Sequence, residues 1–512
     1  MRPAPSVFLS GTADAAALLS ALRQAGYQIS RAARVTFTVL DTIDGRLHVN
    51  GLRLVATQSD TLTLTLSGPS SSPGSAVVSS LPIRASDLPA GPWRDSVAAA
   101  GGERLLLAQA TVAATRTVAS LCTPSGEVRS LVTLDDKMHL SGRRKPLASA
   151  VTVHRVAGKG KARRRAEALC VEAGLLAHGD VLGEVLDQAD VDLTGVAGSP
   201  ADLDVTTLAI DGFRWVLTDL FVAVEGYWRG AVDRCDPAFV RGLRVVTRRS
   251  RSVLVEGRNV LPREAQAMAG AGLGLLGAHT SAARDLDVFV EEWDGYLGLL
   301  PSESVAALAP LRGLLQARRA VAYAELAVGL SSPEVNHFVR EWGKWLRKPV
   351  PARSLARSPD STRPLGEVVG ERIERAHLML LENGRLITDE SPAAQLHDLR
   401  RDAKRLRYLL ECFSGVLPTK ATKQFVRRLK ALQDNLGAHQ DAEVHALQLM
   451  MLLQQHAADD LAQETTAAAT LLVQHLQQRT AAARREFSTR FEEYDSPTSQ
   501  VALWRVLAVA PD

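Results

Sequence analysis

Apolar and polar positions repeat with two different periods along the chain, and the period changes near residue 200. Before that point, short runs tend to alternate with period two, which is the pattern of strands with one buried face. The run Thr61–Leu66 (TLTLTL) alternates strictly. The predicted strands are Arg34–Leu40, Arg46–Ala56, Thr61–Leu66, Leu105–Thr117, Val128–Leu134 and Ala148–Arg155. We therefore predict an antiparallel β domain over residues 1–195.

The sequence also predicts a helix, a turn and a loop before or between these strands. A short helix is predicted at Ala13–Ala25. Asp44 and Gly45 separate the first two strand-like runs and predict a hairpin turn. The segment Ser67–Ser75 (SGPSSSPGS) has the composition of a loop.

From about Asp202 onward, apolar residues recur at the three- and four-residue spacing of amphipathic helices. One stretch, residues 347–364, is rich in Pro, Ser and Arg and predicts a linker or exposed loop. A tail follows at 496–512. The predicted helices are Thr206–Ala231, Ala238–Gly257, Pro262–Leu276, His279–Gly298, Val305–Gly329, Pro333–Leu346, Leu365–Asn383, Ala393–Gly415, Thr419–Gly437, Gln440–Ala457 and Asp459–Glu492. The chain is thus expected to be an α+β protein in two parts.

An internal repeat organises the helical part. The segment RGLRVVTRRSR (Arg241–Arg251) aligns with HDLRRDAKRLR (His397–Arg407) at an offset of 156. The same offset aligns ARDLDV (Ala283–Val288) with HQDAEV (His439–Val444). Two motifs that share one offset predict two related helical bundles, at 205–346 and 365–495.

Each copy of the repeat carries a stripe of cations on one predicted helix. Steps of three and four residues place such side chains on a single helix face. Like charges at these spacings repel by roughly 0.2–0.5 kcal/mol per pair, so a stripe of this kind indicates an anionic ligand. The first stripe consists of Arg241, Arg244, Arg248 and Arg251, and the second stripe consists of His397, Arg400, Lys404 and Arg407.

The two stripes would face one cleft if the copies pack about a pseudo-two-fold axis. Arginine matches phosphate oxygens in a bidentate way, whereas Lys404 would act as a point charge and His397 would donate to an oxyanion. Other cations flank the stripes or lie on the next predicted helix. The candidate anion-binding residues are Arg241, Arg244, Arg248, Arg249, Arg251, His397, Arg400, Lys404, Arg405, Arg407, Lys423, Arg427 and Lys430, with Arg428 beside the last three.

Two simpler interpretations compete with this one. A single Arg-rich helix is more often a solvated surface, and only the repetition at a fixed offset argues against that here. The acidic motifs Arg284–Asp287 and Asp441–Glu443 are interpreted as ion-pair partners that orient the arginines. A catalytic role is not favoured, because no metal-binding histidine pattern accompanies the carboxylates.

Composition narrows the class of ligand. The net charge is only +4, so positive charge must act locally rather than over the whole surface. Aromatic residues make up 5% of the chain, and only Tyr408 adjoins the stripes, which is too few for the stacking platforms of single-stranded nucleic-acid sites. An all-phosphate ligand is expected, and nucleic acid is not.

Cysteine usage and hydropathy predict a reducing, cytoplasmic location. The four cysteines, at positions 122, 170, 235 and 412, show no paired spacing, which argues against a disulfide framework or a cysteine zinc site. We expect neither a signal peptide nor a membrane span, because the N-terminus lacks a long apolar core and no window approaches 18 uninterrupted apolar residues. The oligomeric state is not predicted.

These motifs resemble the CHAD family, the conserved histidine α-helical domain. LHDLRRDAKRLRYLLECF and LKALQDNLGAHQDAEV are similar to its second signature pair, and VRGLRVVTRRSRSVL and LGAHTSAARDLDVFVEEW are similar to its first. The resemblance covers roughly 205–495. It implies two four-helix bundles around a basic cleft that binds inorganic polyphosphate, in proteins found on polyphosphate granules. The chain departs from the family at Arg241, where the first-copy histidine is expected.

The N-terminal part resembles a diverged CYTH domain, of the triphosphate tunnel metalloenzyme superfamily. The similarity lies in Val39–Ala56 and in Ala110–Asp136. It implies an antiparallel β tunnel, with Arg53 and Arg116 where phosphate-binding residues would be expected. The family holds its metal with glutamates on the first and a later strand. Ser6–Gly11 and Ala150–Val156, which stand in those places, contain no acidic residue.

The leading hypothesis is a non-enzymatic polyphosphate-binding protein without catalytic residues, metal or cofactor. One alternative is a triphosphatase acting through the N-terminal domain, against which the missing carboxylates argue. Another is a nucleic-acid-associated scaffold, against which the modest net charge and scarce aromatics argue.

Overall fold

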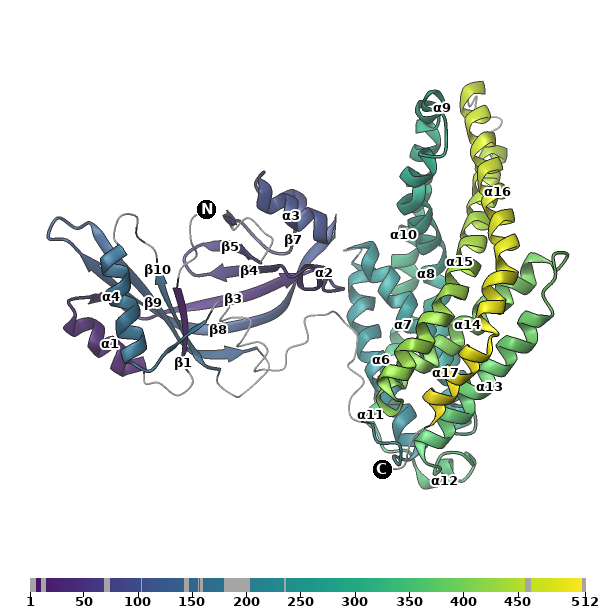
Figure 1. Cartoon of the computed structure of the whole chain (residues 1–512), viewed down its shortest axis with the longest axis horizontal. Helices are drawn as coiled ribbons and strands as arrows, with labels where there is room; N and C mark the ends of the chain where they lie inside the picture. The colour runs from purple at the N-terminus through teal and green to yellow at the C-terminus, as the bar shows by residue number, and fades with distance from the viewer. Residues whose placement is uncertain are drawn as a thin grey trace. The chain divides into compact units, whose positions relative to one another are not determined.

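The computed structural model describes residues 6–10, 15–68, 74–102, 104–141, 147–154, 156, 160–178, 203–233, 236–455 and 462–508. The chain divides into two compact units, Met1–Val196 and Ala197–Asp512 (Figure 1). The first unit is built on an antiparallel sheet and the second is helical, so the α+β class is confirmed.

The sheet of the first unit has the strand order β11-β1-β10-β9-β8-β3-β4-β5-β6, and β2 and β7 each pair with β8. All of its pairings are antiparallel. Five of the six predicted strands are found here, and β8 and β9 extend beyond their predicted ends. The sixth prediction, Arg46–Ala56, is only partly right, because the strand β4 begins at Arg53. The strands are β1 Ser6–Ser10, β2 Gln28–Ile29, β3 Ala33–Asp41, β4 Arg53–Gln58, β5 Leu62–Ser67, β6 Gly74–Val78, β7 Ile83–Arg84, β8 Leu105–Cys122, β9 Val128–Leu140, β10 Ser149–His154 and β11 Leu176–His178.

Short helices cover the two ends of this sheet. The helices are α1 Ala15–Gln24, α2 Arg46–Val49, η1 Ala85–Asp87, α3 Pro92–Gly101 and α4 Gly160–Glu172. Figure 1 shows α1 and α4 together at one end, where Leu22, Ala166 and Cys170 share an apolar cluster with Val151 and Val153 of β10. Trp93 and Val97 of α3 pack with Leu54 and Leu64 in a separate cluster at the other end. Arg155 and residues 69–73 of the predicted loop lie outside the described residues.

The predicted hairpin turn at Asp44 and Gly45 is wrong, although β3 and β4 do pair. The chain forms the helix α2 at this point instead. The Asp41 carboxylate accepts hydrogen bonds from the backbone N–H groups of Thr42, Leu47 and His48, at 2.6, 2.8 and 2.8 Å. Gly45 adopts a left-handed φ of 66° before the helix. One buried carboxylate therefore holds a helical turn that the alternating pattern did not reveal.

The second unit consists of two series of helices. The first series is α6 Ala209–Val232, α7 Pro237–Glu256, α8 Arg263–Leu297, α9 Ser302–Ala307, α10 Ala309–Leu330 and α11 Pro333–Arg347. The second series is α13 Leu365–Arg385, α14 Ala393–Cys412, η2 Ser414–Val416, α15 Thr419–Gln455, α16 Gln463–Tyr494 and α17 Pro497–Leu507, and α12 Ala352–Leu355 lies between the two series. None of the helices in the described ranges combines the length and apolar character that a bilayer crossing requires.

The two series keep the offset seen in the sequence. Helices α13, α14 and α15 begin at the repeat equivalents of the residues that begin α6, α7 and α8, respectively. Leu208 and Pro364, which are also equivalent positions of the repeat, form an antiparallel β-bridge just before α6 and α13. A residue that pairs with its own repeat equivalent is expected where the two copies meet around a pseudo-two-fold axis.

Two predicted helix breaks are absent, one in each series. Helices α8 and α15 each run through a glycine, Gly277 and Gly437, where separate helices were expected. A Cβ at Gly277 would lie 3.7 Å from Arg251, and one at Gly437 would lie 3.7 Å from Arg400. A Cβ at either position would thus meet an arginine only at an ordinary van der Waals distance, and the two glycines lower intrinsic helix stability without ending either helix.

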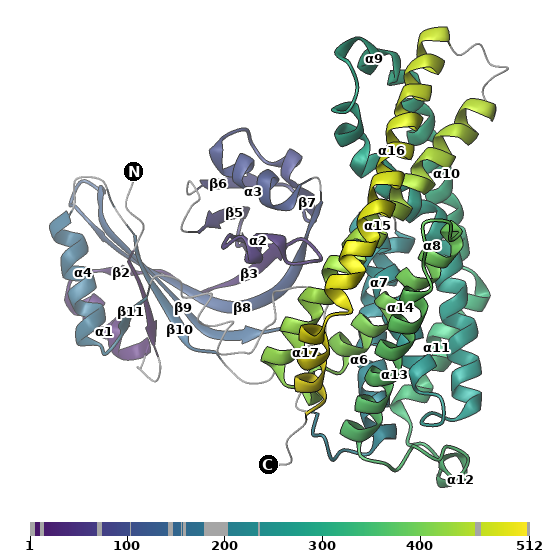
Figure 2. The same ribbon diagram turned by 45° about the vertical axis from the view of Figure 1, so that its right-hand side comes forward.

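Beyond the stripes, the long helices extend together. Figure 2 shows the ends of α8 and α10 beside those of α15 and α16, with α9 at the tip. One apolar cluster joins them, including Phe289 and Trp293 of α8, Leu449 of α15 and Leu472 of α16. The two series are therefore one packed body, because they share this core.

The segment 347–364 is more tightly held than its composition predicts. It contains α12, and Ser358 and Ser361 are only 3% and 1% exposed. The Asp360 carboxylate accepts a hydrogen bond from Arg372 at 2.7 Å. Two backbone N–H groups at the start of α6 donate to carbonyl groups of Ser361 and Arg363. These contacts fix the segment against both series.

Candidate anion-binding site

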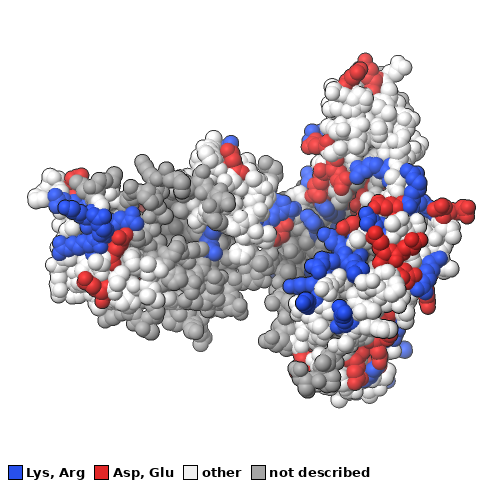
Figure 3. All heavy atoms as spheres, in the orientation of Figure 1, with Lys and Arg blue, Asp and Glu red and all other residues white. Residues whose placement is uncertain are grey.

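Helices α7 and α14 pack against each other and carry the two cationic stripes. Each helix buries an apolar face, represented by Leu243 and Val253 on α7 and by Leu399 and Leu406 on α14. Helical periodicity then turns the stripes away from that face. The space-filling view shows Lys and Arg side chains gathered into a patch on the helical unit, with Asp and Glu side chains beside it (Figure 3).

A pocket of about 500 Å³ lies where the two helices meet, and we call it the α7/α14 pocket. Cations from both copies of the repeat line it. They are Arg248 and Arg251 from α7, and His397, Arg400, Arg401, Lys404 and Arg405 from α14. Members of both stripes therefore share one concave surface.

A second pocket of about 360 Å³, the α14/α15 pocket, shares two of these residues. Arg400 and Lys404 line both pockets, and Arg407 and Arg479 line the second. Carboxylates also line it, at Glu292, Asp434 and Asp441. The second pocket is therefore close to electrical balance, whereas the first carries a clear excess of positive charge.

Polar neighbours orient the second stripe. The His397 ring and an Arg400 guanidinium nitrogen both donate to the Gln440 side-chain oxygen, at 2.6 and 3.0 Å. Arg400 also donates to Asp441 at 3.2 Å. In the first copy, Arg244 donates to Ser281 at 2.7 Å and lies 4.0 Å from Asp285. The Arg244–Asp285 and Arg400–Asp441 pairs occupy equivalent positions of the repeat, so the interpretation of these two carboxylates as orienting partners is confirmed.

The other acidic residues of the motifs behave differently. Asp287 is 1% exposed and accepts from Arg319 at 2.6 Å and from the Tyr323 hydroxyl at 2.7 Å. It therefore holds α8 to α10 and does not orient a stripe. Arg284 pairs with Glu291 one to two turns along α8. Glu443 makes no ion pair within the part of the chain that the structure describes.

Lys404 is the most perturbed cation of the site. Burial, followed by the positive charges of Arg400 and Arg248, lowers the pKa of its amine to about 7. The Asp441 carboxylate opposes this shift only partly. Beside it, the Nε–H groups of Arg400 and Arg407 are buried and make no hydrogen bond among the described residues, although Arg407 Nε lies 3.3 Å from a carboxylate oxygen of Glu411. The site thus concentrates more positive charge and more donors than its own acceptors satisfy.

Two of the candidate anion-binding residues form ion pairs between the two copies of the repeat. Arg249 of α7 pairs with Glu411 of α14 at 2.7 Å, and Arg405 of α14 pairs with Glu256 of α7. Arg405 also lines the α7/α14 pocket, whereas Arg249 lines neither pocket. Arg407 contacts Glu411 at 3.3 Å.

The remaining predicted residues lie outside both pockets. Arg241, Lys423, Arg427 and Lys430 are exposed, and Arg244 is half-buried against α8. On α15, the spacing of Lys423, Arg427 and Lys430 continues along one face toward Asp434, which lines the α14/α15 pocket. These side chains add positive charge to the surface around the pockets but do not line either pocket.

Comparison with known protein families identifies the helical unit. Residues 216–450 match the CHAD domain family, a range that includes both stripes and both acidic motifs. The helical unit contains a CHAD domain. The comparison with curated proteins finds no match.

Solved structures similar to this chain include the CHAD domain from the plant Ricinus communis, with 24% identity and a TM-score of 0.48, covering 57% of this chain and 95% of that one. PptA from Streptomyces chartreusis shows 19% identity and a TM-score of 0.41, covering 56% and 100%. The PH1819 protein from Pyrococcus horikoshii OT3 shows 12% identity and a TM-score of 0.24, covering 37% and 98%.

Sequence reasoning missed Arg479, which reaches the α14/α15 pocket of the CHAD domain from α16. Its guanidinium lies over the Tyr296 ring, 5.5 Å from the centroid. Arg479 belongs to no cationic stripe, and its neighbours come from α8, α14 and α15. No signal in the sequence identifies it, because only the packing of these helices brings it to the site.

The structure of the N-terminal unit changes the expectation for Arg116. Its guanidinium donates two hydrogen bonds to Asp135, at 2.7 and 2.8 Å, and lies 5.3 Å from the centroid of Phe37. Arg53 is half-buried on β4. Strands β1 and β10 carry no carboxylate, and the described residues contain no group of three His, Cys, Asp or Glu side chains that could hold a metal.

Proposed function

We propose that this protein binds inorganic polyphosphate without chemically altering it, through the α7/α14 and α14/α15 pockets. The observation that supports this most is the sharing of Arg400 and Lys404 by two adjacent pockets. A linear polyanion can occupy both pockets at once, whereas a single small anion occupies one. Each phosphate would then replace water around cations that are crowded in the free protein.

The lining favours phosphate over nucleic acid. Nucleic acid presents bases, which proteins recognise by stacking on aromatic rings. Tyr408 and Tyr296 are the aromatic residues that line these pockets. Tyr408 is 5% exposed, and Tyr296 is 2% exposed with its hydroxyl hydrogen-bonded to His445. Neither offers an open ring face to a base.

The proposal also covers the identity of the helical bundles and of the N-terminal unit. We infer that the two helical series are the repeated bundles of the CHAD resemblance, with the pockets as its basic cleft. We also infer that the N-terminal unit is a diverged, non-catalytic CYTH-type domain. The pairing of Arg116 with Asp135 supports this, because it occupies a cation that a triphosphate would need. We further propose that the protein is cytoplasmic and associates with polyphosphate granules.

The proposal can be tested with the full chain, labelled long-chain polyphosphate and single-stranded DNA of similar charge. We expect polyphosphate to bind at least tenfold more tightly at matched salt. Replacing Arg400, Lys404 and Arg407 together with Gln should abolish polyphosphate binding while helical circular dichroism is retained. Equal affinity for polyphosphate and DNA would contradict the proposal.

A matched control removes charge elsewhere on the same unit. Replacing Arg312, Arg340 and Lys344 with Gln removes three exposed cations that line neither pocket. This variant should retain the affinity for polyphosphate within about twofold, because these exposed charges line neither pocket and are screened by salt. Equal losses in both triple variants would mean that net charge, and not the pockets, binds the ligand.

A further inference from the structure

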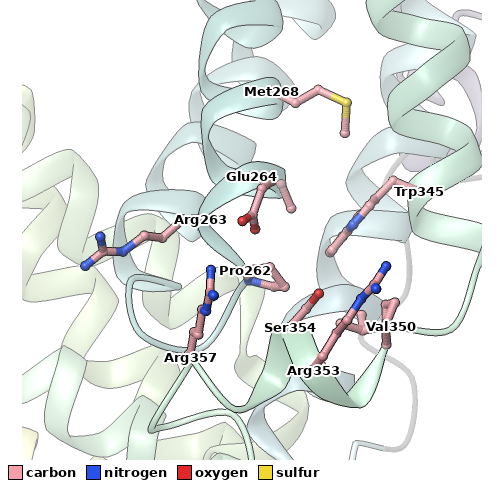
Figure 4. Close-up of a pocket in the computed structure, with 11 residues that line it drawn as sticks. Pro262, Arg263, Glu264, Met268, Trp345, Val350, Arg353, Ser354 and Arg357 are labelled. Carbon is pink, nitrogen blue, oxygen red and sulfur yellow. The ribbon is translucent and has the colours of Figure 1, made fainter.

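A larger cavity, of about 850 Å³, lies away from the stripes, between the start of α8, the end of α11 and the segment with α12 (Figure 4). We call it the α8/α12 pocket. None of its lining residues lines the other two pockets. Its volume lies within the range of about 300–1,000 Å³ that is typical of small-molecule sites.

One side of the α8/α12 pocket is cationic. Arg353 and Arg357 extend toward the cavity, whereas the guanidinium of Arg263 points away from it (Figure 4). Neither Arg353 nor Arg357 has a carboxylate within ion-pair distance among the described residues. Glu264 is the carboxylate that lines the pocket. Two guanidinium groups without ion-pair partners, four residues apart, form a site suited to a phosphate group.

Much of the rest of the lining is apolar, and in this apolar part Val350 and Trp345 lie beside Arg353 (Figure 4). Met268, Ala265 and Val350 line the pocket together with Trp345. The Trp345 ring stacks on Trp342, with centroids 4.8 Å apart and planes 4° from parallel, and Arg214 lies 5.5 Å from the Trp345 centroid. These contacts fix the ring and leave it half-buried at the cavity.

The segment with Arg353 and Arg357 is anchored on both sides of the cavity. Before α12, the Arg214 guanidinium donates to the carbonyl groups of Leu346 and Lys348, at 2.8 and 2.5 Å. After α12, the Asp360 N–H donates to the Asn259 carbonyl at 3.0 Å. The backbone that carries Arg353 and Arg357 is therefore fixed before any ligand arrives, which lowers the entropy cost of binding.

We propose that the α8/α12 pocket binds a nucleoside phosphate. Its phosphates would lie against Arg353 and Arg357, and its base would lie along Met268 and the edge of Trp345. Glu264 would accept a hydrogen bond from the amino group of the base or a sugar hydroxyl. This combination favours a nucleoside phosphate over two other anions. Inorganic phosphate has no apolar group to contact the apolar side chains of the pocket. A fatty anion has no hydrogen-bond donor for the Glu264 carboxylate. The inference is independent of polyphosphate binding.

The test uses the full chain, ATP and inorganic triphosphate, with binding followed by titration calorimetry. ATP should bind at least tenfold more weakly to the double variant Arg353→Gln, Arg357→Gln than to the unchanged protein. Arg263→Gln is the matched control, and it should change the ATP affinity by less than twofold because that guanidinium points away. Met268→Glu should also weaken ATP binding at least tenfold, because it puts a negative charge in the apolar part of the lining.

A third variant separates this site from the polyphosphate site. The variant with Gln at positions 400, 404 and 407 should retain ATP binding and lose triphosphate binding. The inference is overturned if ATP does not bind the unchanged protein, if ATP binding survives in the Arg353→Gln, Arg357→Gln variant, or if it disappears only when positions 400, 404 and 407 are changed.

Discussion

The guanidinium of Arg249 on α7 donates to the carboxylate of Glu411 on α14, with 2.7 Å between Nη2 and Oε2. Arg405, the repeat equivalent of Arg249, pairs in turn with Glu256 on α7, one residue beyond the position equivalent to Glu411. The two ion pairs therefore join equivalent helices of the repeat in both directions. This reciprocity is what an approximate two-fold axis between the copies requires.

These reciprocal pairs should contribute unequally to stability. Glu256 is 3% exposed, so Glu256→Gln leaves Arg405 without its charged partner at a buried position and should lower the free energy of unfolding by about 1–3 kcal/mol. Glu411→Gln should cost about 0.5–1 kcal/mol, because both partners are about 30% exposed. Urea unfolding followed by circular dichroism would measure both. Glu341→Gln, at an exposed pair with Lys344, is the control and should have almost no effect.

Polyphosphate affinity should fall as the pH rises from about 7 to 9. In the free protein the pKa of Lys404 is lowered to about 7, so its amine loses its charge over this interval. A bound polyanion raises that pKa, so the complex takes up a proton and its affinity should be about four- to tenfold weaker at pH 8.5 than at pH 7. Titrations at several pH values would measure this. Lys404→Arg should remove most of the pH dependence of the affinity, because arginine stays charged. An unchanged pH dependence in that variant would contradict its assignment to Lys404.

Lys404 should also lower the stability of the free protein. Its folded-state pKa is below the unfolded value, so below about pH 7 folding confines a charged amine beside Arg400 and Arg248, and this penalty is fully present. Between about pH 7 and 10 folding instead releases the proton of the amine, and the penalty declines as the pH rises. Lys404→Met should therefore raise Tm by about 1–3 °C, with a larger gain at pH 6 than at pH 9, while it weakens polyphosphate binding. Lys430→Met, at an exposed position, is the control. A lower Tm for Lys404→Met would mean that the side chain stabilises the fold through its packing.

Two glycines on α13 should respond oppositely to alanine. A Cβ at Gly384 would lie 2.0 Å from the ring of Phe491 on α16, whereas a Cβ at Gly370 would meet nothing within 4 Å. Gly384→Ala should destabilise the helical unit by about 1–3 kcal/mol through overpacking. Gly370→Ala should stabilise it by about 0.5–1 kcal/mol through reduced chain entropy. Thermal unfolding of both variants is the measurement, and equal effects would show that α13 and α16 are not packed as described.

Arg479 should contribute to polyphosphate binding although it belongs to no stripe. Arg479→Gln removes a cation of the α14/α15 pocket and should weaken polyphosphate binding about two- to fivefold and reduce the salt dependence by about one charge. Arg485→Gln, an exposed change on the same helix, should leave the affinity unchanged. If the two variants behave alike, the α14/α15 pocket is not part of the binding surface.

By itself, the sequence determined the features that depend on spacing along the chain. The constant offset of the repeat predicted the equivalence of α7 with α14 and of the Arg244–Asp285 and Arg400–Asp441 pairs, because helical periodicity decides which side chains share a face. It also located the longer strands of the sheet, except at α2, where one buried aspartate overrode the alternating pattern, but it did not predict β1, β2, β6, β7 or β11.

The tertiary structure alone decided which faces meet. The partners of Arg249 and Arg405, the arrival of Arg479 at the site and the anchoring of the Arg-rich segment around α12 all depend on contacts between residues far apart in the chain. Composition predicted that this segment is a linker, whereas its packing places it along the α8/α12 pocket. Spacing along a helix specifies a direction, but only the packing of neighbouring helices specifies what lies in that direction.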